Sequence, residues 1–361
     1  MGAKSRALWT LRVIPLIILL VVFVAWFSYV SWSLHLFIAA RPHLQVNCSE
    51  MDDPHHLADY LKNRTVIHER ENSTERMTAA KCWGIKKRWY FPGEVPDTME
   101  VHHPVYYIRI VSQDYAFFEE IFNMFYSPIH FYCYPIAETA SESFERKVRF
   151  LGDCMLNVIV PPRKFDTSNV TDIFRAHSSC FHRMSGFDWR HMFVSQESQV
   201  PLQSVHFYSD VMRRIGGVSK IGHEILTEEN TIALGDPSNL EHEEAKVSLL
   251  RDVCNWLHGK KEILALSRAA AQVFYPLVMN STLDDCLQPS ELEGKCPTGH
   301  FDEDNNCIWG MENIKQARRS KSFFIHADPS FDLGFIQCVH DFVHDRTYNT
   351  AFYPNVKYGS H

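Results

Sequence analysis

The stretch VYYIRIVSQDYAFFEEIFNMFYSPIHFYCYPI, residues 105–136, decides the fold class of this chain. Its two ends, 105–111 and 129–136, are apolar runs rich in β-branched and aromatic residues, which is typical of buried strands. Between them, residues 114–126 place Phe117, Ile121 and Met124 on one face of a helix. A strand, a helix and a second strand joined by short connections predict two parallel strands covered by the helix.

The same alternation continues on the C-terminal side of this stretch. Residues 141–151 have helical spacing with Ser141 placed as the N-cap, 156–162 predict a strand, 171–184 a helix and 191–195 a strand. Residues 100–220 therefore predict an α/β fold with a mostly parallel sheet. The second half is less regular: helices are expected at 241–257 and 331–345, a strand running into a helix at 262–275, and a loop rich in Cys, Asp and Pro at 280–307.

The N-terminus has the pattern of a membrane anchor. Residues 1–12 carry Lys4, Arg6 and Arg12 and no acidic residue, and the apolar run 13–32 that follows has no charge. About twenty such residues are enough for a helix to cross the hydrocarbon core, and the preceding positive charge keeps the N-terminus cytosolic. We therefore expect a cytosolic tail at 1–12, an anchor at 13–32 and single-pass type II topology. A cleaved signal peptide ending near residues 37–42 is the alternative, and it also sends the rest of the chain to the secretory lumen.

Cysteines and glycosylation sequons agree with a lumenal location. All ten cysteines follow the apolar run, as expected for disulfides formed in an oxidising compartment. Five Asn-x-Ser/Thr sequons lie on the same side, which predicts a glycoprotein. Their asparagines are Asn47, Asn63, Asn72, Asn169 and Asn280.

Composition and missing motifs exclude several classes of protein. The net charge of −7 argues against nucleic acid as a partner. There is no G-x-S-x-G, no P-loop, no G-x-G-x-x-G and no H-E-x-x-H, so the common hydrolases, NTPases, dinucleotide enzymes and zincins are not predicted. We expect a polar stem or irregular lead-in at 33–100, one large lumenal domain at 101–345 and a C-terminal tail at 346–361.

Two acidic or histidine patterns could bind metal. Asp302 and Asp304 form a D-x-D, whose carboxylates could hold a divalent ion against a diphosphate, and a solvated acidic loop is the competing interpretation that we favour. His340 and His344 lie four residues apart on the predicted last helix and could bind zinc. With no third ligand in evidence, we expect both histidines to face solvent, and no metal site is predicted.

A basic cluster precedes the stretch FFIHADPSFD. Its side chains could bind a diphosphate, or they could equally form the basic last turn of a helix. Its members are Lys315, Arg318, Arg319 and Lys321.

Five stretches in order give the chain a family resemblance. They are YYIRIVSQDYAFFEEIFNMFYSPIHFYCYPIAETASESF (106–144), LGDCMLNVIV (151–160), AHSSCFHRM with DWRHMFVSQESQVPLQS (176–204), KEILALSRA (261–269) and CIWGMENI with RRSKSFFIHADPSFDLGFIQC (307–338). Together they resemble the core-2/I-branching β-1,6-N-acetylglucosaminyltransferases, relatives of the peptide xylosyltransferases. The resemblance covers roughly residues 100–345.

The resemblance implies a type II Golgi enzyme with a GT-A-like fold. Such an enzyme transfers N-acetylglucosamine from UDP-N-acetylglucosamine to a sugar hydroxyl with inversion and without a metal, so no cofactor is expected. Its partners would be the nucleotide sugar, a glycan acceptor and the membrane, and a homodimer is left open. The alternative is an inactive family member that acts as a lumenal binding protein.

The resemblance also places candidate residues. The family's lysine that contacts the diphosphate falls on His326, and the aspartate of its G-Q-D-F-P segment falls on Gln199. The candidates for the uridine side are Val111, Ser112 and Glu138, and those for the diphosphate are His326, Arg318 and Arg319. Glu291 or Glu293 is the expected catalytic base, which takes the acceptor proton, and Glu224 the expected acceptor contact.

By the same resemblance the cysteines would pair as Cys82–Cys154, Cys133–Cys180, Cys296–Cys307 and Cys48–Cys338.

Overall fold

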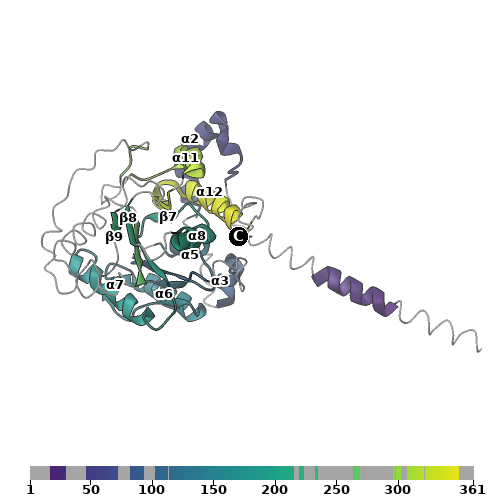
Figure 1. Cartoon of the computed structure of the whole chain (residues 1–361). Coiled ribbons are helices and arrows are strands. Elements are labelled where there is room, and N and C mark those ends of the chain that lie inside the picture. Colours follow the sequence, from purple (N-terminus) through teal and green to yellow (C-terminus); the bar gives the residue numbers. More distant parts are fainter. Residues whose placement is uncertain are drawn as a thin grey trace, which may run out of the picture.

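The computed structural model describes most of the domain and part of the N-terminal segment (Figure 1). The described residues are 17–29, 46–71, 82–92, 102–112, 114–214, 219–222, 232–234, 263–268, 271, 296, 298–301, 307–320 and 322–348.

A seven-stranded sheet forms the centre of the molecule. Its strand order is β4 (Val158–Ile159), β2 (Phe131–Cys133), β1 (Val105–Arg109), β6 (His191–Ser195), β10 (Ile263–Ser267), β8 (Ser219–Gly222) and β9 (Ile232–Leu234). The first four strands are parallel to one another, and β10, β8 and β9 follow as successive antiparallel neighbours. Five of the seven strands therefore run in one direction, which confirms the predicted α/β fold with a mostly parallel sheet.

Two short pairs of strands flank this sheet. β11 (Phe324–His326) pairs antiparallel with β7 (Gln199–Pro201), and β3 (Ile136–Ala137) pairs parallel with β5 (Lys164–Phe165). The predicted strand at 129–136 is thus divided into β2 and the start of β3. Pro135 lies at the division, and because proline has no N–H it cannot donate to a continuing ladder. Its carbonyl accepts from the Val111 N–H at 3.0 Å.

The helices follow the predicted alternation. They are η1 (Glu50–Asp52), α2 (Pro54–Glu71), α3 (Cys82–Arg88), α5 (Tyr115–Met124), α6 (Glu142–Cys154), α7 (Val170–Met184), α8 (Val205–Arg214), η6 (Met311–Asn313), α11 (Ile314–Arg319) and α12 (Pro329–Tyr348). The predicted cap of α6 is confirmed, since the Ser141 hydroxyl accepts from the Phe144 N–H at 3.1 Å. The helix predicted at 241–257 lies outside the described residues.

An aromatic row crosses the three inner parallel strands. Tyr107 on β1 stacks on Tyr132 of β2 and on Phe193 of β6, with ring centroids 5.4 and 5.6 Å apart. On this face, Phe118 of α5 meets Tyr134 at 4.7 Å. On the opposite face, a disulfide joins Cys133 of β2 to α7. The sheet is therefore covered on both sides, as parallel strands require.

The N-terminal segment is part of the packed domain. Asp332, at the start of α12, is fully buried and accepts hydrogen bonds from the Tyr60 hydroxyl, the Arg64 guanidinium and the Met311 and Phe335 N–H groups. Tyr60 and Arg64 lie on α2, and Figure 1 shows α2, α11 and α12 together at one side of the sheet. The prediction of an irregular stem at 33–100 is therefore corrected for residues 46–64, because long-range polar contacts order a segment that lacks apolar periodicity.

Two features of α12 correct the sequence interpretation. The helix continues to Tyr348, inside the expected tail. His340 and His344 are buried and do not face solvent. His340 lies between α5 side chains, with Nδ1 3.0 Å from Glu120 Oε1 and Nε2 3.0 Å from Asn123 Oδ1. Within the described part of the chain, no three His, Cys, Asp and Glu side chains group as a metal site.

The four disulfides implied by the resemblance are confirmed. They join Cys48 to Cys338, Cys82 to Cys154, Cys133 to Cys180 and Cys296 to Cys307. Of the sequon asparagines, Asn47, Asn63 and Asn169 are described and exposed, and Asn72 and Asn280 lie outside the described residues.

The apolar run 13–32 is described in part, as a helix over 17–29 with exposed side chains. No helix within the described ranges is both long and apolar enough to span a bilayer. The membrane anchor stays a prediction.

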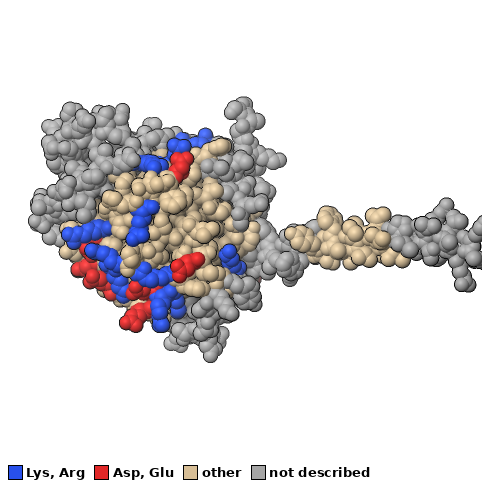
Figure 2. Space-filling model, turned by 90° about the horizontal axis from the view of Figure 1, so that it is seen from below, with Lys and Arg blue, Asp and Glu red and all other residues tan. Residues whose placement is uncertain are grey.

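Charged side chains of both signs intermix on the face shown in Figure 2. Ion pairs join such charges: Glu145 on α6 pairs with Arg149 at 2.9 Å and with Lys164 at 3.2 Å. Neighbouring opposite charges of this kind weaken the field that a single-sign patch would produce.

The close approach of α2 and α12 can be tested at Gly334. A Cβ at this position would overlap the Tyr60 hydroxyl and lie 2.9 Å from Tyr60 Cζ. We expect Gly334→Ala to lower the free energy of unfolding by about 1–3 kcal/mol, because the added methyl pushes Tyr60 off Asp332. Gly186→Ala is the control, since its Cβ would meet nothing within 4 Å. Equal stability of the two variants in denaturant titrations would contradict this packing.

Candidate functional site

The order of the strands reverses between β1 and β6, which is where an open α/β sheet is expected to have a ligand crevice. From β1 the chain passes through α5 to β2 and through α6 to β4, on one side of β1. It then returns through α7 to β6, on the other side of β1. Such a reversal leaves a crevice at the carboxyl ends of the two strands, where ligands of open α/β sheets bind. Arg109 of β1 is paired with Ser195 of β6, so the residues that follow each strand are neighbours.

Ser112 and Glu197 meet across this crevice. The Ser112 N–H donates to Glu197 Oε1 at 2.5 Å, and the Ser112 hydroxyl donates to Glu197 Oε2 at 2.6 Å. Ser112 follows β1, and Glu197 lies in the short loop 196–198 between β6 and β7. Both side chains are partly exposed. One carboxylate thus engages two hydrogen-bond donors at the end of the central strand.

Arg109 holds this loop from inside the protein. Its Nη2 donates to the carbonyl oxygens of Glu197 and Gln199, the latter at 2.7 Å. The side chain is almost wholly buried, and burial lowers the pKa of the guanidinium to about 10, an effect that the Glu197 charge opposes. Arg109 therefore carries its positive charge at neutral pH, beneath the loop that presents Glu197.

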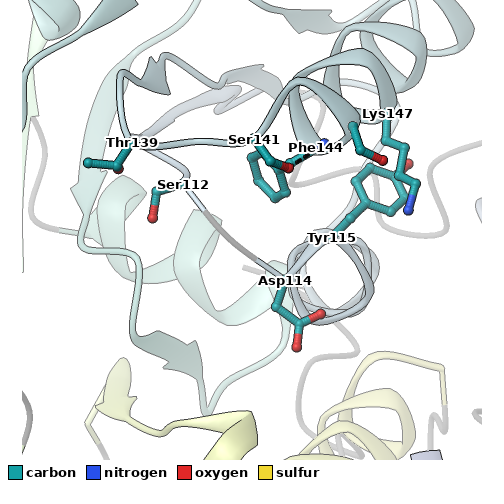
Figure 3. A pocket seen from close by; sticks show the side chains of 8 residues that line it. Ser112, Asp114, Tyr115, Thr139, Ser141, Phe144 and Lys147 are labelled. Carbon is teal, nitrogen blue, oxygen red and sulfur yellow. Dashed lines mark hydrogen bonds between the residues drawn. The ribbon is translucent and has the colours of Figure 1, made fainter. Parts of the chain in front are cut away.

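A pocket of about 310 Å³ opens beside Ser112 (Figure 3). Figure 3 shows Ser112 and Thr139 on one side of it and Tyr115 and Lys147 on the other. This volume is at the lower end of the range for small-molecule sites, roughly 300–1,000 Å³. The lining residues come from the ends of β1 and β3 and from the starts of α5 and α6: Ser112, Asp114, Tyr115, Thr139, Ser141, Ser143, Phe144 and Lys147.

The chemistry of the pocket is polar with one aromatic wall. Asp114 caps α5 from the left-handed region (φ 48°), its carboxylate accepting from the Ala116 and Phe117 N–H groups at 3.1 Å. Lys147 reaches over Tyr115, its Nζ 5.8 Å from the ring centroid. The lining also holds serine and threonine hydroxyls and the ring of Phe144. Hydroxyls can bind the polar groups of a ligand, and the Lys147 ammonium can meet a negative charge on the side of the pocket away from Ser112.

Three predicted uridine-side residues gather at this place. Val111 is buried and bridges to Ile136, and Ser112 lines the pocket. Glu138 is exposed and immediately precedes Thr139, a lining residue. The structure therefore brings Val111, Ser112 and Glu138 to one end of the sheet.

His326 reaches the same loop from β11. It is paired with Gln199, and its Nδ1 lies 2.8 Å from the Ser198 hydroxyl. His326 is buried, and it is joined through Ser198 to the loop that carries Glu197.

The predicted diphosphate arginines lie on α11. Arg318 donates to Asp52 at 2.8 Å and to the Cys48 carbonyl at 2.7 Å, so its guanidinium holds the N-terminal segment. Arg319 is exposed. The remaining candidates Glu224, Glu291 and Glu293, together with Lys321 and the D-x-D at 302–304, lie outside the described residues.

Sequence reasoning missed Arg109, Glu197 and Lys147. Arg109 was visible as the single charge inside the apolar strand 105–111, a strong sign of a buried polar contact. Glu197 follows β6, and the rule that ligands meet the carboxyl ends of strands would have pointed to it once the strand order was known. Lys147 lies on the helix predicted at 141–151, and only the tertiary structure turns it toward Tyr115.

Comparisons with known proteins agree with this architecture. The model of the family described as Core-2/I-Branching enzyme matches residues 105–288, just over half of the chain. The chain is also similar to the human N-acetyllactosaminide beta-1,6-N-acetylglucosaminyl-transferase, with 25% identity over 100 residues. That match covers 27% of this chain and 25% of the relative, so it spans about a quarter of the relative's length.

The contribution of Arg109 to the site can be measured. We expect Arg109→Met to lower the free energy of unfolding by about 3 kcal/mol, because the buried carbonyl of Gln199 and the partly buried carbonyl of Glu197 lose a charged donor. Hydrogen exchange of residues 196–199 should also become faster. Arg268→Met is the matched control: Arg268 also donates to two carbonyls, at 2.9 and 2.7 Å, but its side chain is 35% exposed, so about 1 kcal/mol is expected. Equal losses of unfolding free energy in the two variants would mean that the burial of Arg109 adds nothing to the stability of the loop.

Proposed function

The chain belongs to the Core-2/I-branching enzyme family, whose members are glycosyltransferases, and from this premise we propose its reaction. It transfers N-acetylglucosamine from UDP-N-acetylglucosamine to a glycan hydroxyl and forms a β-1,6 branch, with inversion and without a metal ion. The name of the human relative, a beta-1,6-N-acetylglucosaminyl-transferase, supports the sugar and the linkage. The observation that carries the proposal is the pocket beside Ser112, which opens after the end of β1 and is lined from β3, α5 and α6.

In this proposal the donor nucleotide occupies the crevice. The uridine lies against Val111, Ser112 and Glu138, and the pocket hydroxyls bind its polar groups. Lys147 supplies positive charge at the pocket, and electrostatic stabilisation of the leaving diphosphate is the largest demand of the reaction. His326 and Arg319 are the further candidates for the diphosphate. Arg318 would have to leave Asp52 to contribute.

The transfer itself needs a carboxylate base. The acceptor hydroxyl loses its proton to Glu291 or Glu293, its oxygen bonds to C1 of the sugar, and the bond from C1 to the diphosphate breaks on the opposite face. UDP leaves with the electron pair of that bond. Glu224 is the proposed acceptor contact.

An activity assay tests the proposal. The full chain, purified in detergent, is given UDP-N-acetylglucosamine and galactose-terminated oligosaccharides, with EDTA or with Mn²⁺. We expect equal UDP release in both buffers and a β-1,6-linked product by NMR. One of Glu291→Gln and Glu293→Gln should lower kcat by about 10²–10⁴-fold, the usual contribution of a general base. Asp153→Asn, an exposed acid at the far end of α6, is the control.

Two results would overturn the transferase. Binding of UDP without turnover on any acceptor would favour the inactive family member that acts as a lumenal binding protein. If a folded chain does not bind UDP, the proposed donor site at the end of β1 is wrong.

We further propose that the protein is a single-pass type II Golgi membrane protein anchored by residues 13–32. The uncharged apolar run, the four disulfides and the exposed Asn47, Asn63 and Asn169 support this location.

Glycosylation of Asn169 provides a test of this topology. Asn169 is the N-cap of α7, and its side chain accepts from the Asp172 N–H at 3.3 Å. Thr171→Ala removes the sequon while keeping this cap, so one glycan should be lost by mass spectrometry without loss of stability. Asn169→Gln should lose the same glycan and also about 1 kcal/mol of stability. A full-length chain from secretory cells whose mass does not change on treatment with an N-glycosidase would contradict the lumenal location.

A further inference from the structure

The contact between Ser112 and Glu197 lies where a ligand would be bound. The crevice between β1 and β6 is the ligand position of this sheet topology, and its two donors at the end of β1 are the Ser112 N–H and hydroxyl. Ser112 also lines the 310 Å³ pocket. A ligand that extends from the pocket into the crevice therefore meets donors that the chain's own carboxylate already holds.

The surroundings of these donors favour an anion. Arg109 places a buried positive charge beneath the loop, and buried charges act strongly because the local dielectric constant is low. Among the described residues, Arg109 Nη1 and the buried Tyr134 hydroxyl have no hydrogen-bond partner. Backbone and hydroxyl donors above a guanidinium are the groups that bind carboxylates and phosphates.

We infer that the Glu197 carboxylate is an internal occupant of an anion-binding position, and that an anionic ligand must displace it. The identity of this ligand as a nucleotide diphosphate rests on the proposed function. Glu197 can leave by rotation of its side chain, because Arg109 holds the loop through the Glu197 and Gln199 backbone carbonyls. The side chain is partly exposed, so solvent can receive the displaced carboxylate. Glu197 then regulates access to the donor site.

Removal of one charge tests this inference. Glu197→Gln keeps the shape of the side chain, and its amide can still accept from the Ser112 N–H while it donates to the hydroxyl. We expect the full-length variant to bind UDP at least about tenfold more tightly than the wild type, a change of roughly 1.4 kcal/mol. Uridine has no phosphate, so its affinity should not change. Asp153→Asn is the charge-matched control and should bind UDP like the wild type.

We call the displaceable Glu197 carboxylate the latch. Calorimetry with UDP, uridine and sodium pyrophosphate tests the latch separately from the proposed reaction. Equal UDP affinities in the wild type and Glu197→Gln overturn the latch and leave the transferase proposal intact. Pyrophosphate binding to Glu197→Gln alone, with no binding of UDP or uridine to either protein, supports the latch and overturns the nucleotide site. If none of the three binds either folded protein, both proposals fall.

Thermal unfolding shows whether each variant is folded. If Glu197→Gln proves unstable, Glu197→Ser is the second variant. It shortens the side chain and should give the same gain in UDP affinity.

Discussion

The position of β1 between two parallel strands is the constraint on which the rest of the domain depends. Parallel neighbours can be joined only by crossover connections, and these are right-handed. With β2 on one side of β1 and β6 on the other, the crossover helices must cover opposite faces of the sheet. The strand is consequently buried along its whole length, and its side chains pack as an aromatic row on one face. The same geometry opens the crevice at its carboxyl end.

A buried charge stands at the mouth of that crevice. Burial of a guanidinium is unfavourable unless its donors are satisfied, and Arg109 Nη2 donates to the carbonyl of Glu197 in the loop 196–198 and to that of Gln199 at the start of β7. The loop is fixed in return, and it presents Glu197 to Ser112. Stability of the loop and the electrostatic character of the site thus come from one side chain. A ligand that binds at the end of β1 would therefore meet both the loop that Arg109 holds and the positive charge that Arg109 carries.

The N-terminal segment joins the domain through polar contacts at long range. Asp332 accepts from side chains on α2 and from two backbone N–H groups, and the Cys48–Cys338 disulfide and Arg318 add further links. A buried carboxylate is tolerated because each of its oxygens is hydrogen-bonded. The segment before the sheet is therefore held against α12 and α11, near the chain's own C-terminal helix.

The sequence by itself determined the order of strands and helices in the first half and the capped start of α6. These follow from local periodicity and from capping, which are readable in neighbouring residues. The disulfide pairing was implied only by the family resemblance, because cysteine spacing does not fix which cysteines pair. Only the tertiary structure decided that His340 is buried against Glu120, that residues 46–64 pack on α12, and that Arg318 holds Cys48 and Asp52. It also decided that Glu197 meets Ser112, residues 85 positions apart in the chain. Such pairings depend on the strand order and on long-range packing, and no local pattern encodes which distant donor a given carboxylate will meet.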